Sequence, residues 1–364
     1  MKIREIISSV ESFAPLAFQE DYDNAGLIIG DREQEAKGAL ITVDITEEII
    51  DEAIKKKVNL IIAHHPIIFK GLKKITGKNY IERIIIKALK NDIAIYAAHT
   101  NLDNIQGGVN SKIAEKLNLV NTKILVPLDN HLMKLVYFVP TGHAGQTRKA
   151  IFKAGAGHIG NYDMCSYNVE GKGSFRAGEG TDPFVGHKDE IHFEDEIRIE
   201  TIFPKHLKHN IIRALIEAHP YEEVAYDIYP LENQFEKAGS GIIGELKEEL
   251  SEIKFLEKVK ETFHAKCIRH TKLFHKPVKK IAVCGGSGSF LLNEAIKQKA
   301  DVFISADFKY HQFFDAEDKI IIADIGHFES EQVTKELFYE LLNKKFPKFA
   351  VYLTEVNSNP INYL

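Results

Sequence analysis

The stretch VNLIIAHHPIIF, residues 58–69, places two adjacent histidines directly after an apolar run that ends at Ala63. Such a run predicts a buried strand, and neighbouring side chains on a strand point to opposite faces. His64 and His65 can therefore converge only where the strand ends and the backbone turns, which Pro66 favours. This arrangement suits two metal ions better than one, although a core or loop role is the alternative for an isolated pair of histidines.

The chain around this stretch alternates predicted strands and helices. Residues 39–43 and 93–98 predict further strands, and residues 47–57 predict a helix between the first strand and the histidines. The β-branched runs suit a parallel sheet buried on both faces. Asp44 falls where the first strand ends, and ligand sites in such sheets gather at the carboxyl edge. The sequence thus predicts an α/β module with its site near the two histidines.

Further candidate ligands follow two other predicted strands. Asp103 lies in the polar exit after residues 93–98, and His327 lies in the stretch IIIADIGHFESEQ. Glu331 comes four residues after His327, in the first turn of the helix expected there. With His64 and His65 this gives three histidines and two carboxylates, a set that suits Zn, Mn, Fe or Co. Any one of them alone could be a helix cap or a solvated loop residue.

Composition bounds the protein class. The 364 residues are 44% hydrophobic and 27% charged, as in globular proteins, and leave room for two or three domains. The net charge is -5, so the protein as a whole does not attract nucleic acid or acidic membranes electrostatically. The three cysteines show no C-x-x-C spacing, so neither a disulfide framework nor a cysteine zinc site is indicated. The opening helix is amphipathic and no apolar run reaches membrane-spanning length, so we expect a cytoplasmic protein.

The order of predicted strands and helices changes between residues 128 and 233. This segment reads strand, helix, turn, strand, helix, strand, which predicts a compact α+β unit of the βαββαβ type. Its centre, GKGSFRAGEGTDPFVG, is expected to form turns without a core. Residues 1–127 and 234–364 share the α/β pattern, as if one module had been opened for an insertion at an exposed loop.

Several motifs resemble those of the Nif-three-like family of dinuclear metal proteins, namely HHP, HTNLD, VCGGSGSF, DFKYH and GHFESE. Bacterial members carry the name GTP cyclohydrolase I type 2 homologue. The loop DYDNAGLIIGD is also similar, with Tyr22 where tryptophan is usual. The middle segment is similar to the inserted domain of the longer bacterial members, which is itself like the ferredoxin-like CutA and PII trimeric folds. The resemblance covers nearly the whole chain and implies a mixed or parallel sheet module with a CutA/PII-like insertion.

The resemblance also implies how the site works. His64 and His65 would bind different ions, Asp103 and His327 would complete one ion each, and Glu331 would bridge both. It implies two divalent ions per subunit, a homohexameric ring built as a trimer of dimers, and hydrolysis of a nucleotide or phosphorylated small molecule by a metal-activated water. The alternative is a non-enzymatic metal-binding or regulatory scaffold whose inserted domain senses a small ligand.

Two groups of residues remain as candidates beside the metals. Proton transfer needs a titratable group near a metal-bound water, which makes His99, Asp307 and His311 candidate catalytic residues and Tyr310 a candidate substrate contact. A hydrogen-bonded structural role is the alternative. The turn GGSGSF, residues 285–290, could hold an anion through its backbone N–H groups. It lacks the third glycine of G-x-G-x-x-G and the Lys-Ser/Thr of a P-loop, which disfavours Rossmann and NTPase functions.

Overall fold

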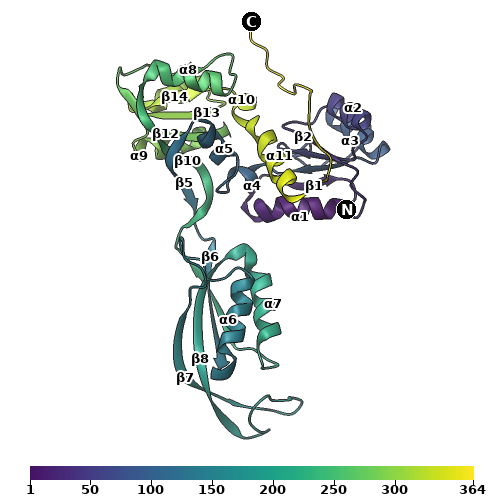
Figure 1. The fold of residues 1–364 in the computed structure, drawn as a ribbon, viewed down its shortest axis with the longest axis vertical. Helices are drawn as coiled ribbons and strands as arrows, with labels where there is room; N and C mark the ends of the chain where they lie inside the picture. Colours follow the sequence, from purple (N-terminus) through teal and green to yellow (C-terminus); the bar gives the residue numbers. More distant parts are fainter. The chain divides into compact units, whose positions relative to one another are not determined.

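The computed structural model describes residues 1–364, which form two compact units (Figure 1). Unit 1 consists of Met1–Pro127 together with Glu236–Leu364, and unit 2 consists of Leu128–Phe235. All the candidate metal ligands lie in unit 1.

The first sheet of unit 1 has five strands in the order β1-β4-β3-β2-β15. Its strands are β1 (Gly26–Ile29), β2 (Ala39–Thr42), β3 (Leu60–Ala63), β4 (Ala94–Ala97) and β15 (Val351–Leu353). All neighbours are parallel except β1, which runs antiparallel to β4. Every residue of β2, β3 and β4 is buried, as expected for strands covered on both faces.

Helices cover both faces of this sheet. The core cluster joins its strands to α2 (Glu47–Lys56) and α3 (Tyr80–Lys90). The other helices that contact this part of unit 1 are α1 (Ile3–Phe13) and α11 (Val333–Lys345). Both α2 and α3 begin at a side-chain cap. The Thr46 side chain accepts from the Ile49 N–H, and the Asn79 side chain accepts from the Glu82 N–H. A cap of this type stabilises a helix by about 1 kcal/mol.

The second sheet has six strands in the order β11-β14-β13-β12-β10-β5. They are β5 (Leu119–Leu128), β10 (Phe235–Ser251), β11 (Arg269–His270), β12 (Pro277–Ser287), β13 (Val302–Ala306) and β14 (Ile321–Asp324). The central strands β12, β13 and β14 are parallel, and β10 and β11 run antiparallel to them. Its further helices are α5 (Val109–Lys116), α8 (Glu252–Thr262) and α9 (Leu292–Lys297).

Unit 1 is therefore built on two sheets. The two halves of the sequence each lend a strand to the sheet of the other half. Strand β15, near the end of the chain, pairs with β2, and strand β5 from the first half joins the edge of the second sheet. This exchange brings the carboxyl ends of strands from both halves into one compact unit.

Unit 2 has the βαββαβ element order that the sequence indicates. Its elements are β6 (Leu132–Pro140), α6 (Ala144–Lys153), β7 (Tyr167–Arg176), β8 (Ile191–Pro204), α7 (Lys208–Ala218) and β9 (Tyr226–Leu231). The sheet order is β7-β8-β6-β9, and all neighbours are antiparallel. Apolar side chains between the helices and one sheet face form its core.

The sequence predicts turns throughout the glycine-rich centre of unit 2, but part of this centre forms a strand. Strand β7 continues through Gly171 and Gly173 to Arg176. Gly173 lies opposite Glu194, and a Cβ placed on it would come within 2.2 Å of the Glu196 carboxylate. Glycine is accommodated in this strand because a neighbouring side chain occupies the space above it.

Short elements complete the chain. The helices α4 (Thr100–Asp103) and α10 (His327–Glu331) follow β4 and β14. Single 3₁₀ turns are η1 (Leu16–Phe18), η2 (Thr141–His143), η3 (Lys205–Leu207) and η4 (Ser289–Leu291), and η5 (Tyr310–Ala316) is a longer 3₁₀ helix.

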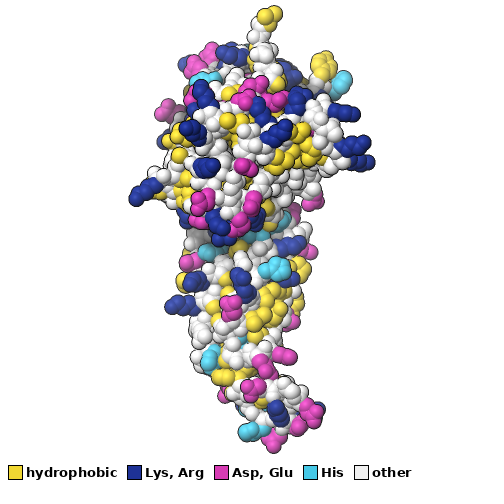
Figure 2. Space-filling model, turned by 90° about the vertical axis from the view of Figure 1, so that its right-hand side faces the viewer, with side chains coloured by type: hydrophobic (Ala, Val, Ile, Leu, Met, Phe, Trp, Pro, Cys, Tyr) yellow, Lys and Arg dark blue, Asp and Glu magenta, His cyan; other side chains and the backbone are white.

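None of the helices combines the length and the apolar character that are needed to cross a membrane. On the face shown in Figure 2, basic and acidic side chains are interspersed. That face therefore lacks the single-sign basic patch that nucleic-acid binding uses.

Replacing unit 2 with a short Gly/Ser linker is expected to leave unit 1 folded. The linker would join strands β5 and β10, which are neighbours in the second sheet, so the ends to be joined lie close together. Circular dichroism and light scattering of the deletion variant would check the fold, and its metal content would be compared with that of the intact chain. A folded, monodisperse variant that binds no metal would show that unit 2 helps to build the site.

Candidate metal centre

The two adjacent histidines are held where β3 ends. The backbone N–H groups of His64 and His65 both donate to the carbonyl of Val43, at 3.1 and 2.9 Å, so the chain stays tied to the loop after β2 while it turns. Their rings lie 4.9 Å apart with an interplanar angle of 44°. Both imidazoles consequently face the same region at the carboxyl edge of the first sheet, as the sequence indicates.

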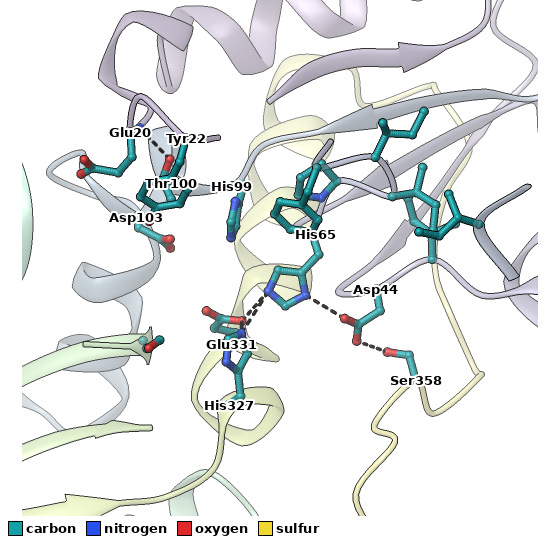
Figure 3. A pocket seen from close by; sticks show the side chains of 18 of the residues that line it. Glu20, Tyr22, Asp44, His65, His99, Thr100, Asp103, His327, Glu331 and Ser358 are labelled. Carbon is teal, nitrogen blue, oxygen red and sulfur yellow. Dashed lines mark hydrogen bonds and ion pairs between the residues drawn. The ribbon is translucent and has the colours of Figure 1, made fainter. Parts of the chain in front are cut away.

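The five candidate ligands form two groups of three that share Glu331, and a third group joins His64, His65 and His99. Figure 3 shows His65, His327 and Glu331 together. In the first group, His64 Nε2 lies 3.7 Å from Asp103 Oδ1 and 3.6 Å from Glu331 Oε1. In the second, Glu331 Oε2 lies 2.9 Å from His65 Nε2 and 3.0 Å from His327 Nε2. Ligand atoms of one tetrahedral ion lie roughly 3.4 Å apart when their bonds are about 2.1 Å long. The spacing in each group is close to that of a ligand set.

Several donor atoms of the centre are buried without a hydrogen-bond partner, namely His64 Nε2, Asp103 Oδ1 and Glu331 Oε2. The last of these lies 2.9 Å from His65 Nε2 and 3.0 Å from His327 Nε2. Leaving a buried polar atom unpaired costs about 1–3 kcal/mol, so such atoms are rare and need an explanation. Converging unpaired donors of these types fit a site for divalent metal ions.

The three imidazoles of the centre are oriented through their outer ring nitrogens. Their Nδ1 atoms bond to the carbonyl of Ala98 from His64 (3.0 Å), to Asp44 from His65 (2.7 Å) and to Asp307 from His327 (2.6 Å). An Nδ1–H that donates outward leaves the Nε2 lone pair directed at the centre, which is how metal-binding histidines are commonly held.

His327 and Glu331 share one helical face. The helix α10 begins at His327, earlier than the sequence indicated, directly after Gly326 with its positive φ of 97°. It passes through Gln332, which keeps helical φ and ψ, into α11. The spacing of four residues places both side chains on one side of the helix. Glu331 therefore lies beyond the first turn, and contacts with histidines rather than the helix terminus account for its charge.

The pKa values of the two carboxyl groups of the centre are shifted in opposite directions. Burial raises the pKa of the Asp103 carboxyl well above its usual range, and the negative charge of Glu331 adds to the effect. Burial alone would also raise the pKa of Glu331, but the imidazoles of His64, His327 and His65 outweigh it and hold that pKa well below its usual range. Glu331 is thus the ionised carboxylate of the metal-free centre.

His99, a candidate catalytic residue, lies beside the centre. Its ring is 5.3 Å from the rings of both His64 and His65. Its Nδ1 bonds to Asp23 Oδ1 at 2.7 Å. Burial opposes ionisation of Asp23, but the bonds from His99 and Thr100 prevail and lower its pKa to about 2. The structure therefore brings His99 to the site as an oriented imidazole backed by a carboxylate.

The DFKYH stretch contributes one residue to the centre. Asp307, in a left-handed conformation with φ of 58°, turns its carboxylate to His327 and positions that ring. His311 is exposed in η5, where its ring contacts Tyr310 and Phe314. The expectation that His311 stands beside the metals is not met, because the chain turns away after Asp307.

The GGSGSF turn packs against the centre, and its three glycine amides are engaged within the protein. Its N–H groups donate to protein side chains, from Gly285 to Asn110 (2.8 Å), from Gly286 to Ser330 (2.9 Å) and from Gly288 to Ser305 (2.9 Å). A Cβ placed on Gly286 would lie 2.1 Å from Glu331 Oε1. The turn therefore allows close approach to Glu331, and its glycine amides are not free to hold an anion.

Sequence reasoning missed the roles of Asp44 and Ser358. Asp44 was placed at the correct strand end, but nothing showed that it would hold His65 (Figure 3). Ser358 donates to Asp44 Oδ2 at 2.7 Å from the C-terminal segment, where no motif marks it. Only the strand-end position of Asp44 was a usable signal.

The fold and the site together define a mixed α/β protein with a candidate metal centre of imidazoles and carboxylates at its strand ends. The model of the Duf34/NIF3 (NGG1p interacting factor 3) family matches residues 1–360, and the chain belongs to this family.

Relatives with known names or structures agree with this membership. A Bacillus subtilis protein named GTP cyclohydrolase 1 type 2 homolog is 41% identical over 367 residues, covering 99% of this chain and 98% of its own. The crystal structure of a Bacillus cereus protein related to NIF3 has a TM-score of 0.88 at 41% identity, covering 100% and 99% of the two chains. A Staphylococcus aureus structure has a TM-score of 0.79 at 28% identity, with 100% and 99% covered.

Proposed function

We propose that this chain is a hydrolase that depends on two divalent metal ions and acts on a nucleotide or a phosphorylated small molecule. The observation that carries the proposal is the sharing of the buried Glu331 carboxylate between two groups of possible metal ligands. One ion would be held by His64, Asp103 and Glu331, and the other by His65, His327 and Glu331. Bound divalent ions of the Zn, Mn, Fe or Co kind supply a water of lowered pKa and polarise a substrate oxygen.

The chain's own residues support this chemistry. Asp44 and Asp307 hold two of the imidazoles in the orientation that metal binding needs. His99 lies next to the centre with Asp23 fixing its outer nitrogen, so its inner nitrogen is available to exchange a proton with a substrate. These residues would position the ligands and move a proton, while the ions would supply the Lewis acidity.

Turnover in the presence and absence of metal tests this function. The protein would be stripped with chelator and assayed, before and after reloading, against phosphomonoesters, phosphodiesters and nucleotides, including GTP because of the relatives' name. We expect hydrolysis of at least one class by the reloaded protein and none by the stripped protein. Equal rates for both, or no hydrolysis at all, would contradict the proposal.

Metal affinity is expected to rise with pH up to about 11, most steeply below about 9, because two imidazoles of the centre compete for protons over that range. Burial alone would lower the pKa of His65, but Asp44 and Glu331 outweigh it and raise that pKa to about 9. Asp307 and Glu331 likewise overcome burial and raise the pKa of His327 to about 11. Both rings are protonated at pH 7 in the metal-free protein and must lose a proton to bind a metal, so acid weakens binding.

Calorimetry measures this proton release directly. Metal would be titrated into stripped protein at pH 7 in buffers of different ionisation enthalpy, and the dependence of the heat on the buffer gives the protons released. We expect at least two protons per chain, from the His65 and His327 rings, and the Asp103 carboxyl, whose pKa burial raises, is a further source of protons. Metal binding without any proton release would contradict the assigned ligands.

The second candidate function is a non-enzymatic metal-binding or regulatory scaffold with a ligand-sensing insertion of the CutA/PII type. It is supported by a separate cavity of about 580 Å³ in unit 2, lined by Phe175, Phe184 and Tyr221 among others. In the turnover assay this function predicts no hydrolysis while metal binding persists.

Assembly and location are also proposals. We propose a cytoplasmic homohexamer, a ring formed as a trimer of dimers, with no membrane partner and no nucleic-acid partner. Light scattering of the purified protein would check the mass, and a monomer at micromolar concentration would contradict the assembly.

A further inference from the structure

The cavity beside the centre has an apolar wall. It has a volume of about 1100 Å³, and the segment after β3 together with α3 lines it with Ile67, Ile68, Phe69, Leu72, Tyr80 and Ile81. The turn η4 after β12 adds Phe290, and the loop before β1 adds Tyr22. Phe69, Tyr80, Phe290 and Tyr22 are 50%, 58%, 68% and 71% exposed. Exposed aromatic side chains gathered around one cavity are typical of a ligand site.

This wall begins at the centre itself. The ring of Phe69 lies 5.7 Å from the ring of His99, nearly perpendicular at 80°. The His99 ring is in turn 5.3 Å from those of His64 and His65. A flat or apolar group that packs on Phe69 would therefore have its attached polar group next to the candidate ligands.

The cavity is poor in cations. Apart from its histidines, the one basic residue that lines it is Lys70, whereas Glu20, Asp44, Glu47 and Glu48 line it outside the two ligand groups. Polyphosphates are normally bound by several arginines or lysines. The charges around this cavity instead disfavour a polyphosphate.

Proteins also bind phosphate chains at helix N-termini and in glycine-rich turns. At both places in this cavity, groups of the protein itself take part in the interactions. The N-terminus of α2, which borders the cavity, carries Glu47 and Glu48 in its first turn. These carboxylates occupy the position that an anion would take at a helix N-terminus. The glycine amides of the GGSGSF turn already donate to side chains of the protein. Neither of these two features is therefore arranged as a cradle for a phosphate chain.

We infer that this site selects phosphomonoesters that carry an aromatic or apolar body and disfavours nucleoside triphosphates. The inference rests on the proposed function, since it places the phosphate end at the two ions. Two divalent ions with the carboxylates of Asp103 and Glu331 leave a net charge of about +2, which a phosphomonoester of about −1.5 to −2 neutralises. A triphosphate brings excess negative charge into a cavity already lined by carboxylates.

Calorimetric titration of the metal-loaded protein tests the selection without relying on turnover. The probes are 1-naphthyl phosphate, inorganic phosphate and GTP. We expect 1-naphthyl phosphate to bind about tenfold more tightly than either of the others, because only it fills the apolar wall. GTP binding as tightly as 1-naphthyl phosphate, or more tightly, would overturn the inference.

Aromatic variants locate the selection. Phe69→Ala and Phe290→Ala should each weaken 1-naphthyl phosphate about tenfold and inorganic phosphate less than threefold, with wild-type metal content as the check on folding. Phe69→Leu should retain most of the affinity. Phe314→Ala, an equally exposed ring at 66% that does not line the cavity, is the matched control. Unchanged binding of 1-naphthyl phosphate by both alanine variants would contradict the assigned wall.

Hydrolysis of the same probes separates the two proposals. A protein that binds 1-naphthyl phosphate in preference but hydrolyses no compound refutes the hydrolase and leaves the selection standing. A protein that binds and hydrolyses GTP in preference refutes the selection and leaves the hydrolase standing.

Discussion

Glu331→Gln is expected to remove both metal ions from the chain, lowering each affinity by about a hundredfold or more. Glu331 supplies one oxygen to each group of ligands, so its loss reaches both sites. The substitution also removes the charge that offsets two neighbouring cations, and like charges repel strongly in a poorly solvated site. Asp103→Asn, which changes one group alone, should mainly weaken one ion.

Titration of metal into the stripped variants measures this effect, with circular dichroism as the check on the fold. Glu329→Gln is the matched control. Glu329 lies on the same helix, is equally buried and bonds to Asn359 at 3.0 Å, but belongs to neither ligand group. Binding of two ions by Glu331→Gln at wild-type affinity would rule out the bridging role.

Gly286→Ala is expected to cause a comparable loss although it removes no ligand. The new Cβ would lie 2.1 Å from Glu331 Oε1, and the φ of +59° is itself unfavourable for alanine. Either the GGSGSF turn or the Glu331 side chain must move. Because Glu331 is shared, its displacement should weaken both ions at least about tenfold.

The same metal titration checks this expectation. Gly71→Ala is the control, because Gly71 lines the same cavity and a Cβ there meets nothing within 4 Å. Wild-type affinity for both ions in a folded Gly286→Ala protein would show that the turn is not needed to place Glu331.

Local sequence was sufficient to select candidate ligands that lie together, because each lies just beyond a buried strand or at helical spacing. His64 and His65 end an uninterrupted apolar run, and His327 and Glu331 are one helical turn apart. Those signals depend on residues a few positions away, and the structure brings the four side chains together as that pattern indicates.

The rest depends on contacts between distant segments. Pairing of β15 with β2 joins the end of the chain to its beginning, and no local pattern encodes such a partner, so the sequence did not reveal that the module contains two sheets. Ser358 reaches Asp44 across 314 positions for the same reason. Asp307 and His311 looked equivalent within DFKYH, and the positive φ of Asp307 decides which of them meets the centre.

The number of metal ions bound per chain tests the dinuclear centre most directly. Stripped wild-type protein would be dialysed to equilibrium against Mn²⁺ or Zn²⁺ at about pH 8, where proton competition is weaker, and its metal content measured by elemental analysis. Two ions per chain are expected, since Glu331 offers one oxygen to each group of donors. Saturation at one ion or fewer in a folded protein would contradict the dinuclear centre.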